Sequence, residues 1–235
     1  MNQKLCAWSG VVFLLLFLAG FCFLAGFMPP PAPSLSPAEV ASVYQGNTNF
    51  IRAGMVLIIL SAGFVAPWTA LISVQLRRIE GAARALTYTQ LIAGAAGIVL
   101  FTVSAIIWAT AAFRPDRSPD LIVLLNDLAW ISVVTPVGPF MVQNIAIGSA
   151  ILQDNSASPV FPRWAGYLNF WVALGLLPGV MGIFFKHGPF AWNGLFVFWI
   201  PLTVFGAWYV VMFVLLLGAI RKDEQAAAAT ASRLP

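Results

Sequence analysis

The chain has 235 residues, of which 60% are hydrophobic and 9% are charged. A soluble domain carries roughly a quarter of charged residues, so too few charges are present here to cover a surface exposed to water. The formal net charge of +4 comes from scattered Lys and Arg, whereas a nucleic-acid-binding surface needs them clustered. The composition therefore excludes a soluble globular protein and argues against a nucleic-acid partner.

Long apolar segments follow one another along the whole chain. A run of about 18 or more apolar residues forms a helix long enough to cross a bilayer, whereas the strands of a β-barrel would alternate with period two. We expect spans near residues 8–27, 52–76, 87–110, 120–152, 164–185 and 189–220. The pattern predicts an all-α polytopic membrane protein. It would be a six-transmembrane-helix bundle with short loops, forming a single transmembrane domain over residues 1–220.

The orientation follows from the Lys and Arg residues of the loops, because cytoplasmic loops carry an excess of them. If the N-terminus is cytoplasmic, the cytoplasmic segments hold Lys4, Arg77, Arg78, Arg84, Arg163, Arg221, Lys222 and Arg233, and the external segments hold Arg52, Arg114, Arg117 and Lys186. This asymmetry predicts that both termini are cytoplasmic, with residues 221–235 as a tail. We expect a multi-pass protein of a bacterial plasma (inner) membrane, with membrane lipids as its surroundings.

The longest polar connection, residues 28–50, begins with a proline-rich stretch. Within it, the sequence SPAE fits a capping box in which Ser36 caps a helix, Pro37 begins it and Glu39 reaches back. We therefore expect an external loop with a short helix. This helix would either pack at the membrane interface or cover an external opening.

The fourth span holds an unusual number of polar groups in the stretch NDLAWISVVTPVGPFMVQN, from Asn126 to Asn144. Asp127 is the only ionisable residue well inside a predicted span, and a carboxylate there costs about 2.5–3.5 kcal/mol. Polar groups in hydrocarbon need partners within the protein, so this face of the helix should point inward. The predicted ligand-binding residues are Asn126, Asp127, Trp130, Gln143 and Asn144. The alternative is a structural role, in which these groups bridge neighbouring helices.

Prolines should interrupt this same span. Pro136 and Pro139 each lack a backbone donor and clash with the carbonyl four residues earlier, and Gly138 lies between them. We expect these three residues to form a kink. It would free the carbonyls of Ser132 and Thr135, for which Gln143 and Asn144 are candidate donors.

No motif for catalysis or for a cofactor is recognisable in the chain. One histidine and two cysteines cannot supply the usual clusters for zinc, iron or haem. There is no phosphate-binding loop, no nucleophile elbow and no dinucleotide fingerprint. We therefore expect no cofactor and no metal, and we assign no catalytic residue.

Three functions are compatible with this pattern. The leading hypothesis is a protein that binds or transports a small, apolar or amphipathic solute, with Asp127 as the charged contact and abundant aromatic residues around an apolar pocket. The second is a non-catalytic accessory or scaffold subunit of a larger membrane complex. Other membrane protein subunits, or further copies of this chain in a homo-oligomer, are the candidate protein partners. The third is a lipid-modifying enzyme that uses Asp127 or His187 at the membrane interface.

Overall fold

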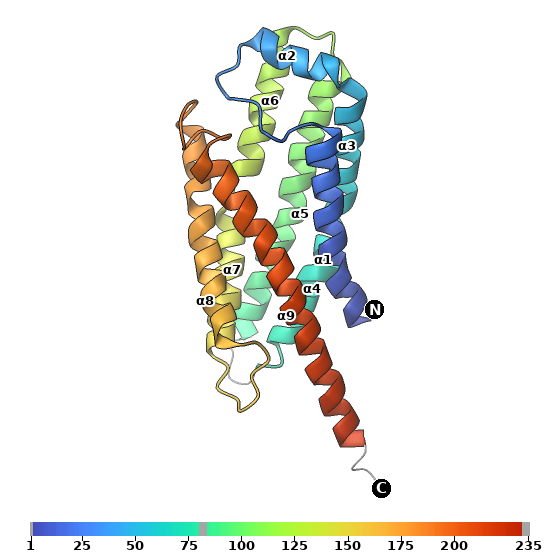
Figure 1. The fold of residues 1–235 in the computed structure, drawn as a ribbon, viewed down its shortest axis with the longest axis vertical. Helices are drawn as coiled ribbons and strands as arrows, with labels where there is room; N and C mark the ends of the chain where they lie inside the picture. Colours follow the sequence, from blue (N-terminus) through green and yellow to red (C-terminus); the bar gives the residue numbers. More distant parts are fainter. Residues whose placement is uncertain (1, 80–83, 232–235) are drawn as a thin grey trace.

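The computed structural model describes residues 2–79 and 84–231. Residues 80–83 of the predicted cytoplasmic loop and residues 232–235 of the predicted tail lie outside the described residues. The described part of the chain is helical and contains no strand. It has six helices long and apolar enough to span a membrane, which gather into one bundle (Figure 1). The predicted six-helix membrane bundle is therefore confirmed, while its orientation stays a prediction.

The observed spans lie close to the expected ones. They are Gln3–Leu24, Thr48–Leu76, Arg84–Phe113, Pro119–Leu152, Arg163–Ile183 and Leu195–Ala229. The last span starts later than residue 189 because residues 189–194 form turns. In this turn the Gly194 N–H donates to the Ala191 carbonyl at 2.8 Å, and the Phe196 N–H donates to the Pro189 carbonyl at 2.9 Å.

Five of the six spans depart from a continuous α-helix; the exception is the third, α5 (Arg84–Phe113). The first comprises α1 (Gln3–Leu18) and a π-helical segment η1 (Ala19–Leu24), and the second comprises α3 (Thr48–Ala62) and α4 (Val65–Leu76). The fourth comprises α6 (Pro119–Val134) and α7 (Gly138–Leu152), and the fifth comprises α8 (Arg163–Leu176) and a 3₁₀ segment η2 (Leu177–Ile183). The sixth begins with a π-helical segment η3 (Leu195–Trp199) and continues as α9 (Ile200–Ala231).

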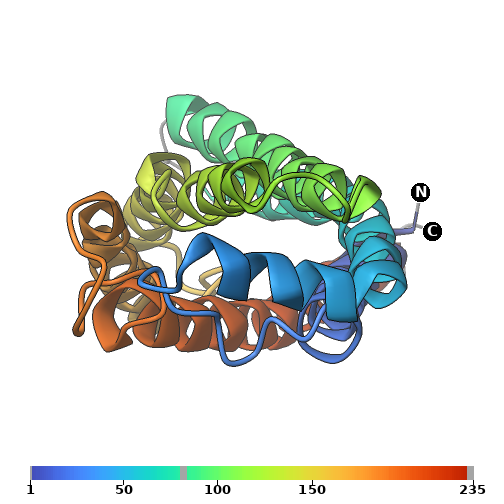
Figure 2. The same cartoon turned by 90° about the horizontal axis from the view of Figure 1, so that it is seen from above.

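The short helix α2 (Pro37–Gly46) lies across one end of the bundle, opposite the end that holds both termini (Figures 1 and 2). We call these the α2 end and the termini end. The capping box is present: the Ser36 N–H donates to Glu39 Oε2 at 2.8 Å, and the Glu39 N–H donates to Ser36 Oγ at 3.4 Å. Val40, Ala41 and Tyr44 are buried, so α2 packs on the bundle through one face.

The core of the bundle is rich in aromatic rings. Trp108 and Trp130 lie with ring centroids 5.1 Å apart, and Phe21 lies 5.8 Å from Trp130. Nearer the termini end, Tyr209 stacks on Trp68 at 5.1 Å. Such rings bury a large apolar area and hold each other in edge-to-face or offset arrangements, so they connect helices that are distant in sequence.

Candidate functional site

The fourth span loses its regular helix at residues 135–137, between α6 and α7. The Thr135 N–H still donates to the Ile131 carbonyl at 3.2 Å, and the Val137 N–H turns back to the Thr135 carbonyl at 2.8 Å. Pro136 has no N–H to offer, so one hydrogen bond of the helical ladder is missing at this position. Asn144 was a candidate donor for the freed carbonyls of Ser132 and Thr135, but its side chain donates to the Phe140 carbonyl of its own helix at 2.8 Å. The Thr135 carbonyl accepts from the Val137 N–H instead.

Two of the predicted polar residues lie at the α2 end. Tyr44 donates its hydroxyl to Asn126 Oδ1 at 3.0 Å, and Asn126 Nδ2 donates to Asp127 Oδ1 at 3.3 Å. Asn126 is 2% exposed, and Asp127 is half-buried. Burial raises the pKa of the Tyr44 phenol, and the Asp127 carboxylate adds to this rise. Tyr44 is therefore a neutral donor that satisfies the Asn126 amide.

The other two polar residues lie on α7 among different neighbours. The side chain of Gln143 contacts Gly94 of α5 so closely that a methyl group on Gly94 would overlap both the Gln143 amide and the Thr69 methyl of α4. The Thr69 carbonyl in turn accepts from Gln90 Nε2 at 3.1 Å. Gln143 and Asn144 are each 2% exposed. The structure thus divides the predicted polar set between two places, and a solute-binding role for either pair stays a prediction.

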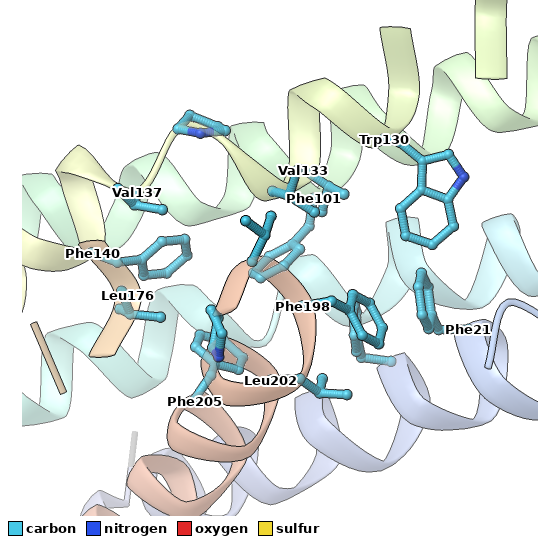
Figure 3. Close-up of a pocket in the computed structure, with 15 residues that line it drawn as sticks. Phe21, Phe101, Trp130, Val133, Val137, Phe140, Leu176, Phe198, Leu202 and Phe205 are labelled. Carbon is cyan, nitrogen blue, oxygen red and sulfur yellow. The ribbon is translucent and has the colours of Figure 1, made fainter. Parts of the chain in front are cut away.

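Beside the interruption of the fourth span lies a cavity of about 120 Å³, and Figure 3 shows side chains converging on it. All 15 lining residues are apolar or aromatic. The fourth span supplies Trp130, Val133, Val134, Pro136, Val137 and Phe140, and the other spans supply Phe17, Phe21, Phe101, Leu176, Val197, Phe198, Pro201, Leu202 and Phe205. The cavity therefore suits a molecule with no polar group to satisfy.

Irregular backbone from three spans meets at this cavity. Phe21 belongs to η1, and Val197 and Phe198 belong to η3. Pro136 and Val137 belong to the interruption itself. Segments of π-helix are rare and occur frequently at functional sites, because an inserted residue changes which side chains face inward. The coincidence marks the cavity as the candidate site.

Of the residues predicted from the sequence, Trp130 and Pro136 line the cavity, and the four polar residues are not among its lining residues. Figure 3 shows the six-membered ring of Trp130 toward Phe21 and Phe198 and its nitrogen on the far side. The Trp130 indole N–H is buried and has no hydrogen-bond partner among the described residues. Trp130 therefore offers the cavity an apolar surface.

Sequence reasoning missed the contributions of the first, third, fifth and sixth spans. The available signals were Pro201, two residues after η3, and the Pro178–Gly179 pair in η2. Each could have indicated a departure from regular helix. A comparison of the chain with known protein families, characterised proteins and solved structures finds no match, so the function rests on the geometry of the chain itself.

Proposed function

We propose that this multi-pass membrane protein binds a small apolar molecule in the cavity beside the interrupted fourth span. The observation that carries the proposal is the convergence of irregular backbone from three spans on a space lined by apolar side chains alone. A bundle that served only as a scaffold would gain by filling this space, since each lining atom without a neighbour loses dispersion contacts. Binding a ligand restores those contacts.

The size and chemistry of the cavity set the class of ligand. An engineered apolar cavity of about 150 Å³ in another protein stays dry and binds benzene. The present cavity, at about 120 Å³, matches a single ring or a short stretch of hydrocarbon chain. Seven of its lining residues are aromatic: Phe17, Phe21, Phe101, Trp130, Phe140, Phe198 and Phe205. They offer ring faces and edges to such a ligand.

Passage of the bound molecule across the membrane would require movement between α6 and α7. Gly138 starts α7, and the place where its side chain would lie is open among the described residues. Together with Pro136, it gives the interruption the properties of a hinge. Binding is the core of the proposal, and transport would use this hinge.

The test is photolabelling with a small apolar probe, a phenyl diazirine, on the full-length protein in phosphatidylcholine vesicles. We expect adducts on Val137 and Phe140, which line the cavity. Val133→Phe places a ring in the cavity and should lower this labelling about tenfold, a change of roughly 1.4 kcal/mol in binding. The matched control is Val142→Phe, at a 46% exposed position of α7, and it should leave the labelling unchanged.

Equal labelling of the cavity residues in the native chain and in Val133→Phe would overturn the proposal. So would adducts confined to outward-facing positions such as Val142. A folded Val133→Phe protein is recognised by unchanged labelling of these outward-facing positions, which report on the intact bundle surface.

A further inference from the structure

A second hollow lies between α1 and α9, next to the cavity. It has a volume of about 240 Å³, and we call it the α1–α9 groove. From α1 it is lined by Leu14, Phe17 and Leu18. From α9 it is lined by Leu202, Thr203, Phe205, Gly206, Ala207 and Val210. Phe17, Leu202 and Phe205 also line the cavity, so these three side chains separate the two spaces.

The groove lies on the outer surface of the bundle. Val210 is 57% exposed, and Leu15 on the neighbouring face of α1 is 63% exposed. Thr203 and Ala207 are also exposed. Both helices belong to spans long and apolar enough to cross a membrane, so lipid hydrocarbon is the medium that meets this surface.

The course of α9 explains why the groove exists. At the termini end α9 contacts α1, where Trp8 and Phe213 lie with ring centroids 5.0 Å apart. Figure 1 shows that α9 then crosses the bundle obliquely toward α8. Gly206 lines the groove from the α9 side, and a methyl group added there would meet no described atom within 4 Å.

The chemistry of the groove indicates its occupant. Its one polar side chain, Thr203, donates its hydroxyl to the Trp199 carbonyl of its own helix at 2.8 Å. The lining of the groove therefore has no unpaired side-chain polar group that could bind a polar ligand. A transmembrane helix is about 10–12 Å across and would remain outside a hollow of 240 Å³. A single extended hydrocarbon chain can enter it.

We propose that the α1–α9 groove is a lateral entrance through which one acyl chain of a membrane phospholipid reaches the cavity. This inference rests on the proposed function and names the class of ligand. Phe17, Leu202 and Phe205 separate the groove from the cavity, so these side chains must turn aside to admit the chain. The headgroup remains at the membrane surface, and the chain end lies against Val133 and Phe140.

The test uses phosphatidylcholine with a diazirine at the end of one acyl chain, mixed into vesicles that contain the full-length protein. In the native chain we expect adducts on Val133 and Phe140. Gly206→Leu fills the groove and should lower this labelling about tenfold, which corresponds to the loss of a bound chain. Gly218→Leu is the matched control on the same helix, because its added side chain also starts in open space but lies outside the groove.

The outcomes separate the two proposals. Labelling of the cavity by the small phenyl diazirine, but not by the lipid, overturns the lateral entrance and leaves the binding cavity intact. Absence of cavity labelling by both probes overturns both. Labelling by the lipid that is equal in Gly206→Leu and Gly218→Leu overturns the entrance. A loss of groove labelling as the protein-to-lipid ratio rises shows that a second copy of the chain covers the groove, and it also overturns the proposal.

Discussion

Two contacts between neighbouring helices contain glycines and yet differ in construction. Where α7 meets α8, a methyl group on Gly148 would lie 2.8 Å from the Gly166 carbonyl oxygen, so the two backbones touch. Where α1 meets α9, a methyl group on Gly206 would meet no described atom within 4 Å. Small residues permit the close approach of membrane helices, but they do not enforce it. The α7–α8 contact is closed, whereas the α1–α9 contact leaves a groove.

The largest expected change in the free energy of unfolding comes from exchanging Gly148 for leucine, compared with the same exchange at Gly206. Gly148→Leu must push α7 away from the α8 backbone, and overpacking of this kind costs about 3 kcal/mol. Gly206→Leu adds a side chain to open space and gains helix propensity, so its free energy of unfolding should change by about 1 kcal/mol or less. Unfolding in mixed micelles with increasing dodecyl sulfate measures both.

Similar losses of stability in the two variants would show that Gly206 is packed as tightly as Gly148. The distinction between a closed and an open contact would then disappear, and with it the space for an acyl chain. Gly218→Leu serves as the reference for a leucine on α9 away from the groove, because its position is also open.

A second prediction concerns the loop that joins α7 to α8. Asp154 is 4% exposed, and it accepts from the Ser156 N–H at 3.1 Å, the Ser156 hydroxyl at 2.7 Å and the Val160 N–H at 2.8 Å. Burial alone would raise the pKa of Asp154, but these hydrogen bonds and the charge of Lys222 bring it below its usual value. The carboxylate therefore fixes the conformation of the loop that joins α7 to α8.

Because the pKa of Asp154 is lower in the folded chain, its contribution to stability is present above the unfolded pKa of about 3.9 and is lost as the pH falls through the folded pKa. Asp154→Ala should lower the free energy of unfolding at pH 7 by about 2 kcal/mol and should remove this part of the acid dependence. The control is Asp116→Ala, an exposed acid in the loop before α6, which should change stability by about 0.5 kcal/mol or less. Equal effects in both variants would contradict the role of Asp154.

The sequence predicts features whose causes are local. Six apolar runs determine the number of spans, and Ser36 with Glu39 determines the start of α2, since both depend on residues close together in the chain. Pro136 and Pro139 likewise carry a local reason for α6 to end at Val134. Each of these follows from hydropathy, capping or the missing proline N–H, without knowledge of any neighbouring helix.

The cavity could not be predicted in this way. Phe21, Phe198 and Phe205 resemble the other phenylalanines of an apolar helix, and only the packing of several spans decides which of them face one another. The bond between Tyr44 and Asn126 joins residues 82 positions apart, so the sequence offered no sign that α2 satisfies this amide. A regular helical period would also misplace the inward faces of the first and sixth spans, because the π-helical segments η1 and η3 shift them.

The smallest expected effect concerns an ion pair that crosses the α1–α9 contact at the termini end. Lys4 Nζ lies 2.8 Å from Glu224 Oε1, and the two side chains are 48% and 55% exposed. Exposed pairs contribute at most about 1 kcal/mol, so Lys4→Gln should lower the free energy of unfolding by about 0.5 kcal/mol at low salt. Screening at about 1 M salt reduces the range of such charges to roughly 3 Å, and the difference from the native chain should then vanish.

Lys4→Gln also tests what keeps the α1–α9 groove open. If the shape of the helices near Gly206 determines the opening, Lys4→Gln should leave the acyl-chain labelling of Phe140 unchanged, as should the charge-retaining control Lys4→Arg. A rise in labelling with Lys4→Gln alone would show that the ion pair restrains the separation of α1 from α9. The opening between α1 and α9 would then depend on the charges at the helix ends, because Lys4→Gln and Lys4→Arg leave the side chains that line the groove unchanged.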